Sequence, residues 1–108
     1  MTFFQDLYLG EKISAKKNQI MKKLNSDKVV VDLFLIVLAN HPDNMLEIVP
    51  QAEILQRGYP DIDFKVVGLA KGKKEAFAVV QRIVEDALNT TGNADVRPYL
   101  KQRWEEQV

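Results

Sequence analysis

The sequence has no cysteine, one histidine and two serines among its 108 residues. The lack of cysteine excludes disulfide bonds, thiolate metal ligands and cysteine nucleophiles, and it is compatible with a reducing cytoplasm. His41 has no second histidine with which to share a metal ion, and Ser14 and Ser26 both lie in or beside one predicted helix, which disfavours a Ser-His-Asp triad. The residues therefore indicate no catalytic group, no metal site and no cofactor.

Long apolar segments are also missing. The longest, residues 29–39, is far shorter than the roughly 20 residues that a membrane helix needs. Residues 1–10 have neither the basic start nor the apolar stretch of a signal peptide. We therefore expect a cytoplasmic protein that makes no membrane contact.

The chain carries no excess charge of either sign, because 15 basic residues balance 15 acidic ones. The charges are nevertheless segregated: residues 11–28 contain six lysines and two acidic residues, whereas residues 29–64 contain one arginine and six acidic residues. A neutral protein with a dipolar surface is better suited to meet its own copy, or a mixed-charge protein, than a nucleic acid backbone. Its 46% hydrophobic content is typical of a single domain, here residues 1–108.

Two short apolar runs, residues 29–39 and 62–70, have the composition of strands, and each is followed by a helical pattern. Strands with so few charges must be covered on both faces, as in a β-α-β unit with a parallel strand pair. We therefore predict a small α/β domain with the element order α-β-α-β-α-α and helices covering the sheet. Asp32 interrupts the first run. It lies either at the solvent-exposed start of the strand or inside the protein as a buried carboxylate with a raised pKa.

The helices follow from apolar spacing and end signals. The first is predicted over residues 11–24, and the second begins at Asn40 or His41 with Pro42 in its first turn and is kinked or split by Pro50. The third has a continuous apolar pattern over residues 76–88 and ends at Gly92 in the left-handed conformation.

The first and last segments of the sequence carry apolar and aromatic residues that we expect to be buried away from solvent. Residues 1–10 form an apolar arm, predicted to make a short extra turn against the domain or a second subunit, and a last helix is predicted over residues 94–106. Its residue types are those enriched at interfaces, although Trp104 could equally pack within the chain. The candidate interface residues are Phe3, Phe4, Tyr99, Arg103 and Trp104.

A ligand pocket is predicted where the carboxyl ends of two parallel strands would meet, at the loops of residues 40–44 and 70–74. Gly72 and the lysines beside it resemble a phosphate cradle at a helix start, but only three residues separate Gly68 from Gly72, and Lys74 stands where a P-loop has a hydroxyl. Anion binding and an ordinary strand-to-helix turn both remain open, as do a general-base and a capping role for His41. The candidate ligand-binding residues are Asn40, His41, Asp43, Asn44, Lys71, Gly72, Lys73 and Lys74.

Residues 32–48, with residues 67–72 and 75–76 downstream, resemble a group of short bacterial proteins that have no assigned function. The resemblance spans about residues 7–92 and supplies no catalytic residue. The favoured hypothesis is a non-enzymatic α/β module of the bacterial cytoplasm that forms a homodimer and acts as an interaction or accessory protein. The alternative is a domain that binds a small anionic ligand, or an enzyme domain, using the two loops.

Overall fold

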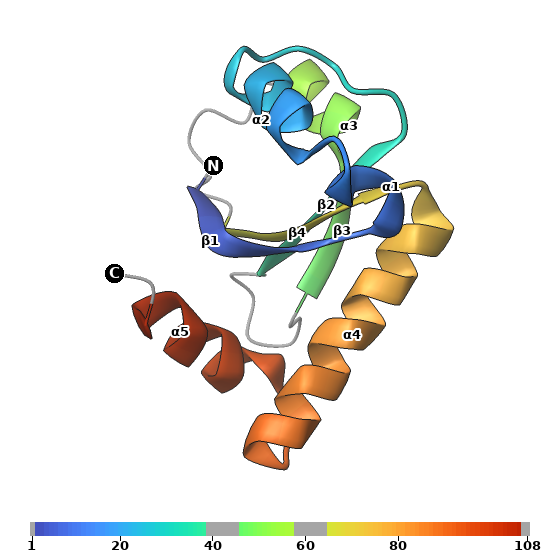
Figure 1. Cartoon of the computed structure of the whole chain (residues 1–108). Helices are drawn as coiled ribbons and strands as arrows, with labels where there is room; N and C mark the ends of the chain where they lie inside the picture. Colours follow the sequence, from blue (N-terminus) through green and yellow to red (C-terminus); the bar gives the residue numbers. More distant parts are fainter. Residues whose placement is uncertain (1, 39–45, 58–64, 107–108) are drawn as a thin grey trace.

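The two apolar runs of the sequence form the two inner strands of a four-stranded sheet. The computed structural model describes residues 2–38, 46–57 and 65–106, and its strand order is β1-β4-β2-β3 (Figure 1). Residues 66–70 of β4 are all buried, as expected of a strand covered on both faces. The described elements are β1 (Thr2–Leu9), α1 (Glu11–Ser14), α2 (Lys17–Asn25), β2 (Leu33–Leu38), β3 (Leu46–Pro50), α3 (Gln51–Arg57), β4 (Lys65–Lys71), α4 (Lys73–Thr91) and α5 (Val96–Glu106).

The predicted α/β class and the presence of one parallel strand pair are confirmed, but the two apolar strands are not that pair. β2 and β4 run antiparallel, and β4 pairs in parallel with β1 instead. The reason is the extra strand β3, which forms an antiparallel hairpin with β2 and reverses the chain before α3. Because β3 and β4 are both antiparallel to β2, they point the same way, and α3 makes the crossover between strands that flank β2.

The segment predicted as the second helix contains a strand and a helix. Residues 46–50 form β3, so Pro50 is the last residue of a strand and does not kink a helix; α3 begins at the next residue, Gln51. Leu46, Ile48 and Val49 are apolar at spacings that fit either structure, and proline is tolerated at the end of an edge strand. The predicted helix start at residues 40–43 lies outside the described residues.

The N-terminal arm is a strand, where the sequence predicted a turn. Phe4, Leu7 and Tyr8 of β1 are buried, and the pairing of β1 with β4 shifts register between Phe3 and Tyr8. This irregularity breaks the alternation of buried and exposed residues by which a strand is identified in a sequence. The helix predicted over residues 11–24 is likewise interrupted, at residues 15–16, and becomes α1 and α2.

β2 is shorter than the predicted strand of residues 29–39. Val29 and Val31 precede it and are 58% and 73% exposed. Asp32 is also exposed and has a positive φ of 57°, so it lies in the turn before the strand, which is the solvent-exposed one of the two alternatives.

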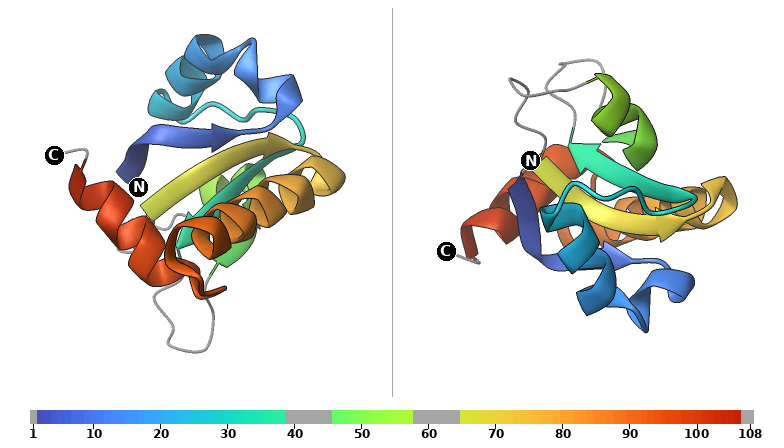
Figure 2. Two further views of the ribbon diagram at one scale, coloured as in Figure 1. Left: turned by 60° about the horizontal axis from the view of Figure 1, so that its bottom comes forward. Right: turned by 90° about the horizontal axis from the view of Figure 1, so that it is seen from above.

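The helices form a layer on each face of the sheet. Figure 2 (right), seen from above, shows α2 and α3 in front of the sheet and α4 and α5 behind it. The long helix α4 is confirmed, with Gly92 as its left-handed end residue at φ 74°, and α5 takes the place of the helix predicted over residues 94–106. None of the helices in the described part of the chain is long and apolar enough to cross a membrane.

Candidate functional site

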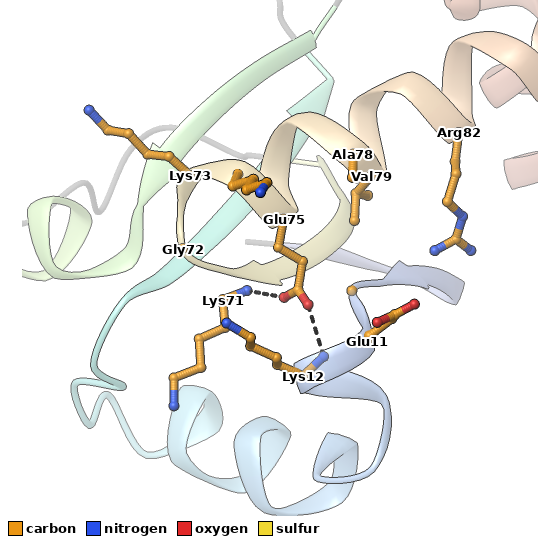
Figure 3. A pocket seen from close by; sticks show the side chains of 11 residues that line it. Glu11, Lys12, Lys71, Gly72, Lys73, Glu75, Ala78, Val79 and Arg82 are labelled. Atoms are coloured by element: carbon orange, nitrogen blue, oxygen red, sulfur yellow. Dashed lines mark hydrogen bonds between the residues drawn. The ribbon is translucent and has the colours of Figure 1, made fainter.

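The two strands whose carboxyl ends were predicted to share a ligand pocket, β2 and β4, do not end on the same side of the sheet. Because β2 and β4 are antiparallel, their carboxyl ends lie at opposite edges, and the loop holding Asn40, His41, Asp43 and Asn44 lies outside the described residues. The segment that does lie beside the end of β4 is the one after β1, since these two strands are parallel. Together they form a pocket of about 500 Å³ (Figure 3), lined by Gly10, Glu11, Lys12, Lys71, Gly72, Lys73, Lys74, Glu75, Ala78, Val79 and Arg82.

Gly72 makes the turn from β4 into α4. Its φ of 85° and ψ of 154° are disfavoured for residues with a side chain, and its N–H donates to the carbonyl of Asp32 at 2.8 Å. The Gly72 carbonyl accepts the N–H of Ala76 at 3.1 Å, which begins the helix. The glycine therefore has a local structural task that requires no ligand.

The carboxylate of Glu75, in the first turn of α4, bridges the segments that follow β1 and end β4. Its Oε2 accepts the N–H of Lys71 at 2.5 Å, and its Oε1 accepts the N–H of Lys12 at 2.9 Å (Figure 3). A Cβ on Gly10 would lie 2.2 Å from Glu75 Cδ, so the close approach of this carboxylate requires glycine there. The helix start thus holds a negative charge supplied by the chain itself.

Two of the cationic side chains around this pocket are not directed at Glu75. Lys73 extends away from Glu75 in Figure 3, and Arg82 donates to the carbonyl of Leu9 at 3.0 Å. These features favour the ordinary strand-to-helix turn over the phosphate cradle. A ligand-binding role for Lys71, Gly72, Lys73 and Lys74 stays a prediction. Within the described ranges, no group of three or more histidine, aspartate or glutamate side chains could hold a metal ion.

All five candidate interface residues make contacts within the chain, Phe3 by packing against the core. The rings of Phe4 and Trp104 lie 4.4 Å apart between centroids at 48°, and Phe4 is 2% exposed, so the alternative of an intrachain role holds for Trp104. Arg103 donates to the Tyr99 hydroxyl at 3.0 Å and pairs with Asp6 of β1. A subunit contact by these residues, or by the half-buried Phe3, stays a prediction.

A buried hydroxyl network joins β1, α4 and α5. The Tyr8 hydroxyl donates to Asp86 Oδ2 at 2.6 Å, and its oxygen lies 2.8 Å from that of Tyr99, which must therefore supply the proton between them. Burial, followed by the hydrogen bonds to Asp86 and Tyr99, raises the pKa of Tyr8. A phenol that stays neutral keeps donating to Asp86, so the network acts as a clamp between elements.

An apolar face that the sequence reasoning missed lies on the α4 side of the sheet. A Cβ on Gly68 of β4 would approach Val79 of α4 to 3.1 Å, so this side of Gly68 faces the helix. Ile36 of β2 is the register partner of Gly68, and Ile48 of β3 is the partner of Ile36. Side chains of directly opposed residues share a face, so the row continues from under α4 to the edge of the sheet.

The helix α4 has a second apolar stripe beside its buried one. Phe77 and Leu88 are 63% and 43% exposed, and Val80 and Val84, between them at helical spacing, are half-buried. The opposite flank of α4 faces β1, because Arg82 and Asp86 bind Leu9 and Tyr8 there. The second stripe therefore lies on the flank of α4 that points away from β1, on the β2 side of the sheet. We call the resulting surface the α4–β3 face, made of Leu46, Ile48, Phe77, Val80, Val84 and Leu88.

The sequence contained a signal for this face. The apolar residues of residues 76–88 are too many for one buried stripe of a helix, and only four of them, Ala76, Val79, Ile83 and Ala87, are fully buried in α4. The surplus could have indicated a second contact surface. Its neighbour Ile48 could not have been placed, because β3 was predicted as helix.

Comparison of the chain with protein-family models, with curated proteins and with solved structures finds no match. The resemblance to short bacterial proteins stays a prediction, and the function has to be argued from the surfaces of this chain.

Proposed function

We propose that the chain is a non-enzymatic interaction module that works as a homodimer joined through the α4–β3 face. Two observations carry the proposal: the apolar row of the sheet continues from the core to the edge strand β3, and Phe77 on α4 is 63% exposed. A contiguous exposed apolar surface is uncommon on a monomer and marks interaction sites. The bacterial cytoplasmic setting expected from the sequence belongs to this proposal.

A second copy fits this surface better than an unrelated partner, because β3 is an edge strand with regular pairing. Its five residues pair with β2 without a register shift, and Glu47 is its only charged residue. In a two-fold antiparallel pairing centred on Ile48, Glu47 of one chain would face Val49 of the other, so the two carboxylates would not be directly opposed. β1, the other edge, is irregular and carries the exposed Asp6, both of which discourage pairing.

The test is the mass of the protein in solution, measured by light scattering after gel filtration. We expect wild type to have about twice the 12.3 kDa mass of one chain, and Phe77→Glu or Ile48→Glu to have the mass of one chain. Val31→Glu is the matched control, because Val31 is 73% exposed and lies outside the α4–β3 face. A wild type of single-chain mass at about 100 µM, or a dimer that survives both changes, contradicts the proposal.

A further inference from the structure

A second pocket, of about 270 Å³, lies between α5 and the sheet at the opposite end of β4 from Glu75. It opens where β4 begins and β2 ends, at Lys65 and Leu38. Its described lining consists of four apolar residues and three cationic ones, with no acidic residue: Phe4, Leu38, Leu100, Trp104, Lys65, Arg97 and Lys101.

The apolar part of this pocket is firmly packed. Leu100 is fully buried, Phe4 is 2% exposed, and the Phe4 ring lies against that of Trp104. Trp104 is itself half-buried, so one side of its ring packs into the protein while the rest lines the pocket. A preformed apolar wall of this kind binds the body of a small ligand without a large ordering cost.

The cationic part comes from two separate elements. Arg97 and Lys101 are four residues apart on α5 and so lie on the same side of the helix, and Lys65 is the first residue of β4. Asp95 holds the Arg97 guanidinium through hydrogen bonds of 3.0 Å from Nε and 2.9 Å from Nη2. Lys65 Nζ lies 5.9 Å from the centroid of the Trp104 ring, which places positive charge directly beside the apolar wall.

We propose that this pocket binds a small organic carboxylate whose apolar body contacts Trp104 and whose carboxylate lies between Lys65 and Lys101. An apolar wall selects the body, and the ammonium groups at the mouth select an anion over a neutral or cationic ligand of the same shape. The first pocket differs on this point, since two carboxylates, those of Glu11 and Glu75, line it. The inference does not depend on the proposed dimer, because Lys65 and Lys101 lie outside the α4–β3 face.

The test uses the intrinsic fluorescence of Trp104, the only tryptophan in the sequence. Wild type is titrated with 3-phenylpropionate, with its neutral analogue 3-phenylpropionamide and with the cationic 3-phenylpropylamine. We expect the carboxylate to cause a saturable change, the amide to bind at least about tenfold more weakly, and the amine to cause none. Equal affinities for carboxylate and amide, or no saturable change with the carboxylate, overturn the proposal.

A charge-removing double variant then locates the carboxylate. Lys65→Gln with Lys101→Gln should weaken 3-phenylpropionate binding at least about tenfold while leaving the amide unaffected. The matched control is Lys16→Gln with Lys23→Gln, which removes two exposed lysines of the α1–α2 region and should change neither affinity. A control variant that loses as much affinity as the pocket variant reports a general charge effect and also overturns the proposal. Octanoate in place of 3-phenylpropionate distinguishes an aliphatic from an aromatic preference.

Discussion

Glu75 and Gly10 lie closer together than any side chain on residue 10 would allow, because a Cβ there would be 2.2 Å from Glu75 Cδ. Gly10 itself has an extended conformation, φ −65° and ψ 159°, that alanine adopts readily. The need for glycine therefore comes from the neighbouring side chain and not from the backbone, and this distinction can be measured.

Gly10→Ala should lower the free energy of unfolding by about 1 kcal/mol, because it displaces the Glu75 carboxylate from the two N–H groups it binds. In a Glu75→Ala background the same change should be neutral or slightly stabilising, since alanine restricts the unfolded chain. Urea denaturation of the four proteins gives the coupling energy. A loss of equal size in both backgrounds would show that the two residues are not coupled.

Glu75→Ala should leave the N–H groups of Lys71 and Lys12 without their carboxylate acceptor. Because an inorganic anion can take that position, phosphate at about 20 mM should raise the melting temperature of the variant more than that of wild type. Chloride at matched ionic strength is the control for salt. If phosphate shifts both proteins equally, this helix start does not accept an anion even when it is vacated.

Gln51 is the one buried polar residue in the described part of the chain, and it holds the segment before β2 in place. Its Oε1 accepts the N–H of Val30 at 2.7 Å, and its Nε2 donates to the Lys28 carbonyl at 2.8 Å. Gln51→Leu removes both bonds and should cost about 1–3 kcal/mol in urea denaturation, because the Val30 N–H and the Lys28 carbonyl both lose their partner. Gln81→Leu, at an exposed position of α4, should cost less than about 0.5 kcal/mol. Costs of similar size at both sites would contradict this role.

The ionisation of the Tyr8 hydroxyl makes the free energy of unfolding depend on pH in the alkaline range. Burial, with the hydrogen bonds to Asp86 and Tyr99, raises its pKa above the ordinary value of 10.0. The stabilisation by its hydroxyl is therefore complete below about pH 10 and is lost as the pH rises further, when the unfolded chain releases a proton that the folded chain keeps. Tyr8→Phe should be about 1–3 kcal/mol less stable at pH 8, and the difference should shrink between pH 9.5 and 11. A difference that is constant with pH would argue against the raised pKa.

The sequence was sufficient for elements whose signals are local. The helix from residue 73 to Gly92 has repeated apolar spacing and a left-handed end residue, and the burial of β4 on both faces follows from its unbroken apolar run. The direction of β4 relative to β2 could not be predicted from the sequence, because a strand buried on both faces can run in either direction. The hairpin strand β3 decides the direction, and its five residues are too few to separate a strand from a helix by periodicity.

The candidate site was harder to predict than the fold, because it is formed by contacts between residues distant in the sequence. Gly72 was singled out correctly as the turn into a helix, whereas Lys71, predicted in the same loop, is the last residue of β4. The carboxylate of Glu75 accepts the N–H groups of both Lys71 and Lys12. No local pattern joins residues 12 and 75. The α4–β3 face was missed for the same reason, since it requires the register of Ile36 with both Gly68 and Ile48.

The pairing of the first strand with β4 also sets an order for folding during synthesis. Thr2 finds its register partner at Lys65, so the ribosome must add more than half of the chain before β1 has a strand beside which to lie. Until then the aromatic side chains of Phe4 and Tyr8 have no finished core to enter, and such distant pairing is slow to form. Among the described strands, β1 is thus the one that waits longest during synthesis for a strand with which to pair.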